Sequence, residues 1–313
     1  MSVKQATNRI FGIILFRNNP EIYRDSRDSI DGIDGIDGRD GRRQESNKDN
    51  SMKIENNIRK IIPCLDLKEG KVVKGTNFVG LREMGDPLTM AKHYCTTGAD
   101  ELAILDISKT QTGADFNVDL INQISCSIDI PLIVGGGIAS LADIARILQA
   151  GADKVSIASA ALSKPFFIKE AALKFGSEKI IIAFDIQLET ESGKYYLFTH
   201  GGTKKSDWEV FYALEKFTKL GAGEFLITGI DFDGAKQGFD LEFFKEAEKY
   251  TDKPIIASGG AGKIEDFIEL FKQTSVKSGL AASIFHQNEV EIAELKKALA
   301  EAGIKVNKKR NEI

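Results

Sequence analysis

From Ile58 onward, short apolar runs alternate with stretches whose apolar positions recur at helical spacing. Eight runs have the length and composition of strands, at residues 60–66, 101–106, 131–135, 153–157, 180–185, 224–229, 254–258 and 277–281. Seven stretches have an amphipathic helical pattern, at 87–97, 117–125, 140–150, 164–175, 207–220, 239–250 and 263–273. Strands that alternate with helices over about 250 residues predict an α/β fold, a parallel (β/α)8 TIM barrel.

The second half of this pattern repeats the first. Residues 98–105 align with 221–228, and residues 130–148 align with 253–271. An open doubly wound sheet is the alternative for such a pattern. The duplication favours a barrel built from two half-barrels, because two four-strand halves close naturally into an eight-strand ring.

The N-terminal part of the chain departs from the pattern. In residues 30–38 glycine recurs at every third position without proline, so disorder is a better interpretation than collagen. Met52 precedes the first strand run, which leaves open both a real tail and an upstream start that the cell does not use. The expected organisation is an extension at 1–57, disordered or not translated, a catalytic barrel at 58–307 and a C-terminal tail at 308–313.

Composition excludes several classes of function. The chain has 313 residues, 42% of them hydrophobic, which is enough for one large core. Its net charge of −4 argues against a nucleic-acid surface. Three cysteines without a CxxC pair or a convincing secretory signal predict reduced thiols in a cytoplasmic protein. Three histidines exclude a histidine-rich metal site, and no apolar run approaches membrane-spanning length, so we expect neither a metal nor a membrane partner.

Two of the strand runs end in an aspartate. Asp66 closes the run at 60–66, and Asp185 closes the run at 180–185. In parallel barrels the chemistry lies at the carboxyl ends of the strands, and the first and fifth strands of an eight-strand ring are diametrically opposed. The two carboxylates are therefore expected to face each other across the mouth, as the acid and base of a ring closure or isomerisation. Capping of the following turn is the alternative, which the equivalent positions of the pair disfavour.

Clusters of small residues follow strands in both halves. Glycines close the third and seventh strands, and Ala158-Ser159-Ala160 and Ala281-Ala282-Ser283 follow the fourth and eighth. Small residues let backbone N–H groups approach an anion, so the duplicated clusters predict two phosphate sites and a substrate with a phosphate at each end. Tight turns alone are the alternative. The candidate residues are Gly136, Gly137, Ser159, Gly259, Gly260, Ala282 and Ser283.

Several other polar residues are candidates with an ordinary alternative beside each. Lys74 lies in a glycine-bearing segment that runs to about Pro87, which is predicted to be a loop that could act as a lid, although a solvated lysine is the alternative. Asp106 and Asp233 follow strands and could bind hydroxyl groups or cap turns. His200 could hold substrate or pack within its loop.

Charged residues also stand at the opposite ends of four strand runs: Lys60, Glu101, Lys154 and Glu224. If they point inward they form a buried charged ring, which is costly unless its members are paired. Solvent-facing charge is the alternative. Alternation leaves the choice open, because Lys60 shares parity with Asp66 whereas Glu101 does not share parity with Asp106.

Nine motifs occur in the order IIPCLD, KVVKG, GDP, GADEL, VGGGI, GADKVSI, THGG, ASGGAG and AASIFH. With these motifs, residues 58–307 resemble the cyclase subunit family of imidazole glycerol phosphate synthase, from histidine biosynthesis. The sister isomerase of that pathway shares the duplicated barrel and the aspartate pair, but it does not carry PCLD, THGG and AASIFH together.

The resemblance implies a lyase that forms a heterodimer with a glutaminase subunit. Ammonia from that partner adds to a bisphosphorylated ribulosyl formimino aminoimidazole carboxamide ribonucleotide. Ring closure and cleavage then release imidazole glycerol phosphate and an aminoimidazole carboxamide ribonucleotide. The resemblance implies no metal or organic cofactor, and it assigns Asp66 and Asp185 as the acid–base pair, with Lys74 assisting.

The same resemblance assigns further residues to three groups. It matches Gly137 with Ser159 to one phosphate site, and Gly260 with Ala282 and Ser283 to the other. It matches Thr228 and Asp233 to substrate contacts. The four strand-start charges, Lys60, Glu101, Lys154 and Glu224, match a gate through which ammonia enters from a glutaminase docked on the bottom face.

The chain departs from the family pattern at its mouth. Ala158 and Ser159 replace the usual Asn-Thr, and Thr203 follows THGG where arginine is usual. The loop at 229–237 lacks the usual serine, arginine, threonine and serine, which are replaced by Gly229, Phe232, Ala235 and Gln237. These changes leave open a paralogous isomerase or cyclase for another phosphosugar, or a weakly active subunit that binds a glutaminase. The intact aspartate pair favours the cyclase.

Overall fold

The computed structural model describes residues 58–76, 79–107 and 116–307, with the side chains of residues 74–81 outside the description. The predictions for the extension and for the C-terminal tail at 308–313 fall outside these residues and stay predictions. Among the described residues, no helix combines the length and the apolar character needed to cross a bilayer.

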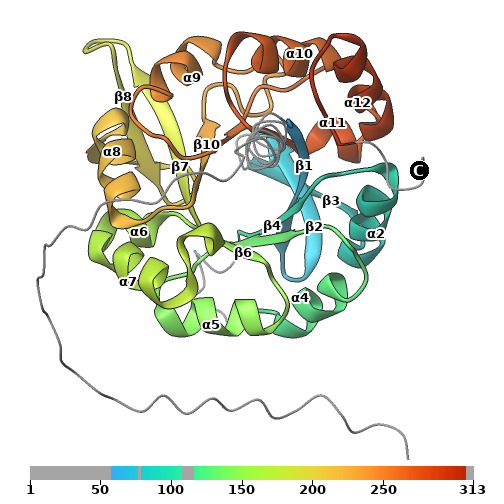
Figure 1. Ribbon diagram of the computed structural model, residues 1–313. Helices are drawn as coiled ribbons and strands as arrows, with labels where there is room; N and C mark the ends of the chain where they lie inside the picture. Colours follow the sequence, from blue (N-terminus) through green and yellow to red (C-terminus); the bar gives the residue numbers. More distant parts are fainter. Residues whose placement is uncertain (1–57, 77–78, 108–115, 308–313) are drawn as a thin grey trace, which may run out of the picture. The chain divides into compact units, whose positions relative to one another are not determined.

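Eight parallel strands form a closed ring, as Figure 1 shows from one end of the barrel. In ring order they are β1 (Lys60–Lys68), β4 (Leu102–Asp106), β5 (Leu132–Gly135), β6 (Lys154–Ile157), β7 (Ile180–Glu189), β10 (Glu224–Gly229), β11 (Ile255–Ser258) and β12 (Ser278–Ala281). Pairing of β12 with β1 and of β7 with β10 completes the ring. The predicted TIM barrel is confirmed, with all eight predicted strands present.

Helices surround the ring (Figure 1). They are α2 (Pro87–Thr97), α4 (Val118–Ser125), α5 (Leu141–Gln149), α7 (Pro165–Phe175), α8 (Val210–Leu220), α9 (Leu241–Ala247), α10 (Ile264–Gln273) and α12 (Ile292–Glu301). Three shorter elements, α6 (Ser159–Ser163), η1 (Ser177–Lys179) and α11 (Ser283–His286), lie in the connections. Three of these helices begin directly after a side chain that caps them. Asp86, Asn117 and Ser140 each accept a hydrogen bond from a backbone N–H of the first turn. The seven predicted helices are confirmed, and α12 adds one that the pattern did not indicate.

The core has two layers because strand side chains alternate between the two faces of the ring. On β1, Ile61 and Leu65 point outward to the helices and belong to the larger apolar cluster. Ile62 and Cys64 point into the barrel. The inner cluster consists of Ile62, Cys64, Ala103, Ile133, Ile181, Leu226, Ile256 and Leu280. The barrel is therefore filled by small and branched side chains along its axis.

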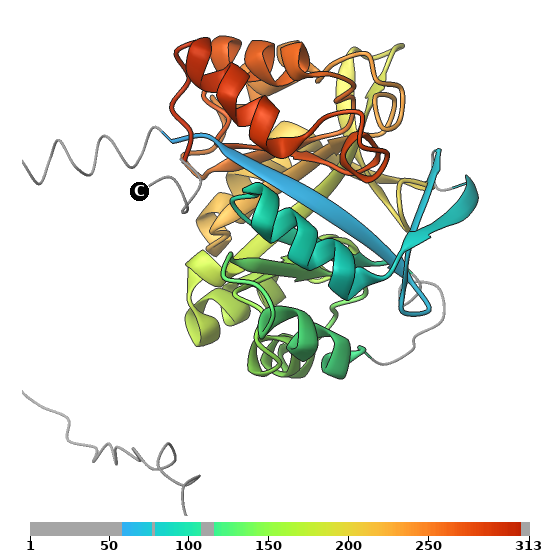
Figure 2. The same ribbon diagram turned by 90° about the vertical axis from the view of Figure 1, so that its right-hand side faces the viewer.

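Each half-barrel extends its first strand into a hairpin. Past the ring, β1 pairs antiparallel with β2 (Lys71–Thr76), which pairs with β3 (Val79–Gly85). In the second half, β7 pairs with β8 (Lys194–Thr199), which pairs with β9 (Lys204–Glu209). Figure 2 shows β2 and β3 projecting beyond the carboxyl end of β1. Both half-barrels thus carry a hairpin after their first strand, in segments that lie outside the aligned parts of the sequence.

The hairpins correct two predictions. The segment that contains Lys74 was expected to be a loop, but its backbone forms β2, with Lys74 in register with Arg82. The helix expected from residue 207 begins at Val210, because residues up to Glu209 belong to β9. The physical reason is the same in both places. A strand that runs past the ring satisfies its backbone N–H and C=O groups by pairing with the chain that folds back along it.

Candidate active site

Asp66 and Asp185 lie on opposite walls of the barrel mouth. In the ring, β1 and β7 are four strands apart in either direction. Asp66 has the inward parity of Ile62 and Cys64, and Asp185 has that of Ile181. Both therefore point toward the barrel axis at the carboxyl end of the ring, near the point where β1 and β7 run on into their hairpins. This is the arrangement expected from the sequence.

The surroundings of the two carboxylates differ. Asp66 is buried, and the Cys64 thiol lies 3.7 Å from its Oδ1 atom, to which it can donate. Asp185 is mostly buried and stands in register with Thr228 on β10. Burial, reinforced by the negative charge of Asp233, raises the pKa of Asp185 to about 6. A carboxyl group with this pKa exchanges its proton close to neutral pH.

The pKa of Asp185 gives a direct prediction. In the free protein, the Asp185 carboxyl carbon should titrate near pH 6 in a 13C NMR experiment, with its signal assigned by its loss in Asp185→Asn. Asp233→Asn should move the midpoint to lower pH, because it removes a negative charge that disfavours ionisation of Asp185. Asp231→Asn is the matched control, since Asp231 accepts a hydrogen bond from Gln187 at 2.7 Å and should leave the midpoint in place. An unmoved midpoint in Asp233→Asn would contradict this assignment.

The glycine clusters occupy backbone conformations that other residues rarely adopt. Gly136 has φ of 101° and Gly260 has φ of 100°. A Cβ atom would lie 2.1 Å from the carbonyl oxygen of Asp106 at the first position, and 1.9 Å from that of Gly238 at the second. Gly137 and Gly259 also have positive φ, at 62° and 88°. The turn geometry alone requires these glycines, so it gives no evidence for phosphate binding. Phosphate binding stays a prediction, and the neighbouring small residues bear on it more directly.

Those neighbours repeat the same geometry in both halves. Ser159 and Ser283 each begin a short helix, α6 and α11. The preceding residues have similar backbone angles, with φ −107° and ψ −102° at Ala158, and φ −123° and ψ −74° at Ala282. Neither residue caps its helix with a side chain. The N–H of His200, in the turn between β8 and β9, donates to Ser159 Oγ at 3.4 Å.

The remaining mouth residues come from β2, from β10 and from the loop after β10. Thr228 lies between Asp185 and Ser258, with which it is in register on β7 and β11. The N–H of Asp233 donates to the carbonyl of Gly229 at 3.0 Å, so this loop folds back toward its own strand. The backbone of Lys74 lies in β2, and its side chain falls outside the described part.

The four strand-start charges form one ion-paired cluster at the other end of the barrel. Lys154 Nζ lies 2.9 Å from Glu101 Oε2 and 3.0 Å from Glu224 Oε2, and Lys60 Nζ lies 2.6 Å from Glu101 Oε1. Burial raises the pKa of Glu224, an effect that Lys154 partly offsets. Burial lowers the pKa of Lys154, but attraction to Glu224 and Glu101 outweighs this and raises it overall. The inward orientation left open by the sequence is the one that the structure has.

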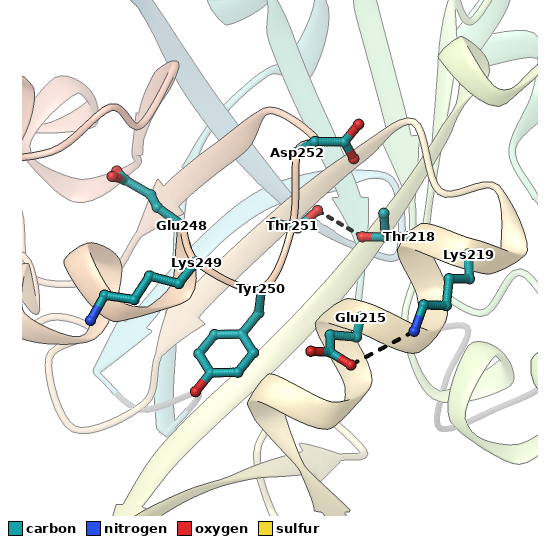
Figure 3. Close-up of a pocket in the computed structure, with 8 residues that line it drawn as sticks. All are labelled: Glu215, Thr218, Lys219, Glu248, Lys249, Tyr250, Thr251 and Asp252. Carbon is teal, nitrogen blue, oxygen red and sulfur yellow. Dashed lines mark hydrogen bonds and ion pairs between the residues drawn. The ribbon is translucent and has the colours of Figure 1, made fainter.

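Two hollows lie at this same end, far from the aspartates. One, of about 530 Å³, lies between the end of α8 and the segment before β11 and includes Thr218, Lys219 and Tyr250 (Figure 3). The other, of about 420 Å³, lies beside the starts of β11 and β12 and includes Arg59 and Lys277. Both hollows are therefore separate from the mouth, which is defined by the strand ends. No group of three or more His, Cys, Asp or Glu side chains within the described ranges is arranged to hold a metal ion.

Comparisons with known proteins agree with this geometry. A family model described as histidine biosynthesis protein matches residues 60–291. The imidazole glycerol phosphate synthase subunit HisF of Staphylococcus saprophyticus is 48% identical over 248 residues, which are 79% of this chain and 98% of the relative. The chain belongs to the HisF family. HisF subunits of Staphylococcus carnosus and Staphylococcus aureus are 46% and 48% identical over the same shares of each chain. The resemblance stated from the motifs is thereby confirmed.

Within this HisF-family barrel, sequence reasoning missed two buried hydroxyl groups. Ser156 on β6 and Ser278 on β12 lie on opposed strands, and their Oγ atoms have no hydrogen-bond partner among the described residues. The duplication offered a signal for one of them. Ser278 and Lys154 each stand five residues before a short helix, α11 and α6, so Ser278 takes the place in the second half that Lys154 takes in the first.

Asp100 is a second omission, and it has a structural role. Its carboxylate accepts hydrogen bonds from the N–H of Ile61 at 2.8 Å, from Lys296 Nζ at 2.7 Å and from Asn307 Nδ2 at 2.8 Å. Asp100 therefore connects the start of β1 to α12 and to the segment that follows α12. The repeated GAD triplet was the available signal, because Asp153 makes the corresponding bond to the N–H of Leu132 at 2.8 Å.

Proposed function

We propose that this HisF-family chain is the ammonia-using cyclase subunit of imidazole glycerol phosphate synthase, a lyase. Its substrate would be the bisphosphorylated ribulosyl formimino aminoimidazole carboxamide ribonucleotide. Its products would be imidazole glycerol phosphate and an aminoimidazole carboxamide ribonucleotide. The placement of Asp66 and Asp185 on opposite walls of one mouth carries the proposal. It supplies two proton-transfer groups on either side of a bound ligand.

The two aspartates would divide the proton transfers between them. Because the pKa of Asp185 is about 6, this group can accept and return a proton near neutral pH. Asp66, held beside Cys64 on the opposite wall, would act on the other side of the substrate. Thr228 and Asp233 border Asp185 and would contact the substrate there. We assign Lys74 an assisting role from the β2–β3 hairpin.

The two phosphate groups of the substrate would lie at the duplicated small-residue clusters. The first site comprises Gly136, Gly137 and Ser159. The second comprises Gly259, Gly260, Ala282 and Ser283. Support comes from the occurrence of these clusters in both half-barrels and from the matching backbone before α6 and α11. The starts of α6 and α11 follow the opposed strands β6 and β12, so the two clusters would lie on opposite sides of the mouth. This arrangement suits a ligand with a phosphate at each end.

Ammonia would come from a glutaminase subunit docked on the amino-terminal face, in a heterodimer. The cluster of Lys60, Glu101, Lys154 and Glu224 closes that end and would serve as its gate. Beyond the gate, the inner apolar cluster leads along the axis to the aspartates. A small neutral molecule such as ammonia loses little by leaving water for such an interior if hydroxyl groups meet it on the way, and Ser156 and Ser278 provide them.

An ammonium-dependent assay tests the proposal. The purified chain, ammonium salt and the bisphosphate substrate should together consume the substrate and yield both products without any glutaminase. Absence of turnover at high enzyme concentration would exclude the cyclase. The altered loop at 229–237 favours one competitor, a paralogue that acts on another phosphosugar, and a panel of phosphosugars would reveal it. Stimulation of a glutaminase without any turnover would instead indicate a weakly active partner subunit.

A further inference from the structure

The hollow beside the starts of β11 and β12 contains an uncompensated positive charge. Its charged and polar lining includes Arg59, Glu248, Asp252, Lys253, Ser275 and Lys277. These residues come from the segments that precede β1, β11 and β12, so the hollow opens on the amino-terminal face of the barrel. Its volume of about 420 Å³ is large enough to admit a side chain of another protein.

Both carboxylates of the hollow are already engaged. Glu248 Oε1 accepts the N–H of Ser275 at 2.5 Å, and Asp252 Oδ2 lies 3.4 Å from Lys253 Nζ. The guanidinium of Arg59 donates to the carbonyls of residues 274–276 at 2.6 to 3.3 Å. Arg59 therefore has its orientation fixed by the backbone.

Lys277 is the cation of the hollow that these contacts do not involve. In the part of the chain that the structure describes, its ammonium group forms no ion pair. Burial lowers the pKa of Lys277, and the neighbouring charges of Arg59 and Lys60 lower it further. A partly desolvated ammonium group beside two other cations gains more from an incoming carboxylate than a fully solvated one does.

Lys277 also stands next to the charged cluster at the amino end. Its carbonyl accepts the N–H of Lys60 at 3.0 Å, and Lys60 in turn contacts Glu101. A subunit that delivers ammonia to this cluster has to seal the surface around it against water. The hollow lies one strand away from Lys60, within the surface that such a seal covers.

We propose that the Lys277 hollow receives an acidic side chain of the subunit that supplies ammonia. Lys277 forms the ion pair with it, and Arg59 adds positive potential from its fixed position. The inference rests on the proposed function, which requires such a subunit. It adds the chemical character of the contact, a carboxylate on the partner that fills a basic hollow on this chain.

Charge reversal at Lys277 tests the inference. We expect Lys277→Glu to raise the dissociation constant for the glutaminase subunit of the same organism by about 100-fold, and Lys277→Met by about 10-fold, because close interfacial charge pairs couple strongly. Isothermal titration calorimetry measures both. Glutamine-dependent turnover should fall at subsaturating partner, while ammonium-dependent turnover in the same preparations should match that of the wild type.

Lys219→Glu is the matched control. It makes the same change of charge on the same face, but Lys219 lies in the other hollow and already faces Glu215 at 3.8 Å (Figure 3). The dissociation constant of Lys219→Glu for the glutaminase subunit should equal that of the wild type. Equal weakening by both reversals would show only long-range attraction and would overturn the inference, as would tight binding by Lys277→Glu. A wild-type chain that binds no glutaminase would also overturn it, and ammonium-dependent turnover would then still decide the cyclase assignment separately.

Discussion

Asp66→Asn and Asp185→Asn should each reduce ammonium-dependent turnover by about 10²- to 10⁴-fold, since a positioned general acid or base contributes that much. Asparagine keeps the size and polarity of the side chain but can neither give nor take the proton. The loss should appear in kcat, because the change removes proton transfer and leaves the phosphate contacts of the substrate in place. Steady-state kinetics at saturating ammonium, with each product quantified by chromatography, measures the effect.

The stability of Asp185→Asn separates a catalytic loss from misfolding. The folded-state pKa of Asp185 lies above the ordinary value, so its ionised form is disfavoured in the fold. Any stability linked to this group is present at low pH and declines as the pH rises through about 6. At pH 8 the uncharged asparagine avoids this cost, so the variant should unfold at or above the wild-type temperature. Turnover close to that of the wild type in either variant would remove the acid–base role of that aspartate.

The barrel and the aspartate pair were accessible from the sequence because both depend on strongly patterned segments. A parallel strand that is covered by helices on one face and fills the barrel with the other is apolar throughout, as in Ile180–Phe184. Such runs are easy to recognise in a sequence. Asp66 and Asp185 directly follow the apolar residues of two of these runs, which places them at the mouth. The duplication then set the two aspartates opposite each other, since equivalent strands of two half-barrels face across the ring.

Features that depend on tertiary pairing could not be predicted in this way. β9 reads KKSDWE and has no apolar alternation, so its extended backbone follows from pairing with β8. The orientation of Glu101 was open because Asp106 has the opposite parity, and β4 shows that Ala103 is the residue that shares the inner face with Glu101. The hollow around Lys277 could not be predicted from the sequence either, because its lining comes from segments that meet only in the closed ring.

Removal of the Lys154 charge should destabilise the barrel strongly. The ammonium group bridges Glu101 and Glu224, whose side chains are 2% and 10% exposed, at 2.9 and 3.0 Å. In Lys154→Met, Glu101 keeps Lys60 as a partner, whereas Glu224 loses the cation that offsets its burial. Breaking a buried ion pair on one side costs about 3–5 kcal/mol, because it leaves an uncompensated buried charge. Urea unfolding followed by circular dichroism measures the change in the free energy of unfolding.

The pH dependence and a double variant identify the cause of that loss. The folded-state pKa of Glu224 is already raised by burial, and removal of Lys154 should raise it further. A carboxyl group with a raised folded-state pKa is most favourable to the fold at low pH, so the deficit of Lys154→Met should be smaller at pH 5 than at pH 8. Lys154→Met with Glu224→Gln should recover most of the lost stability. Lys60→Met should cost much less, because the Lys60 side chain is 39% exposed and contacts only Glu101 in the cluster. A pH-independent deficit would mean that lost packing, and not the buried charge of Glu224, destabilises the variant.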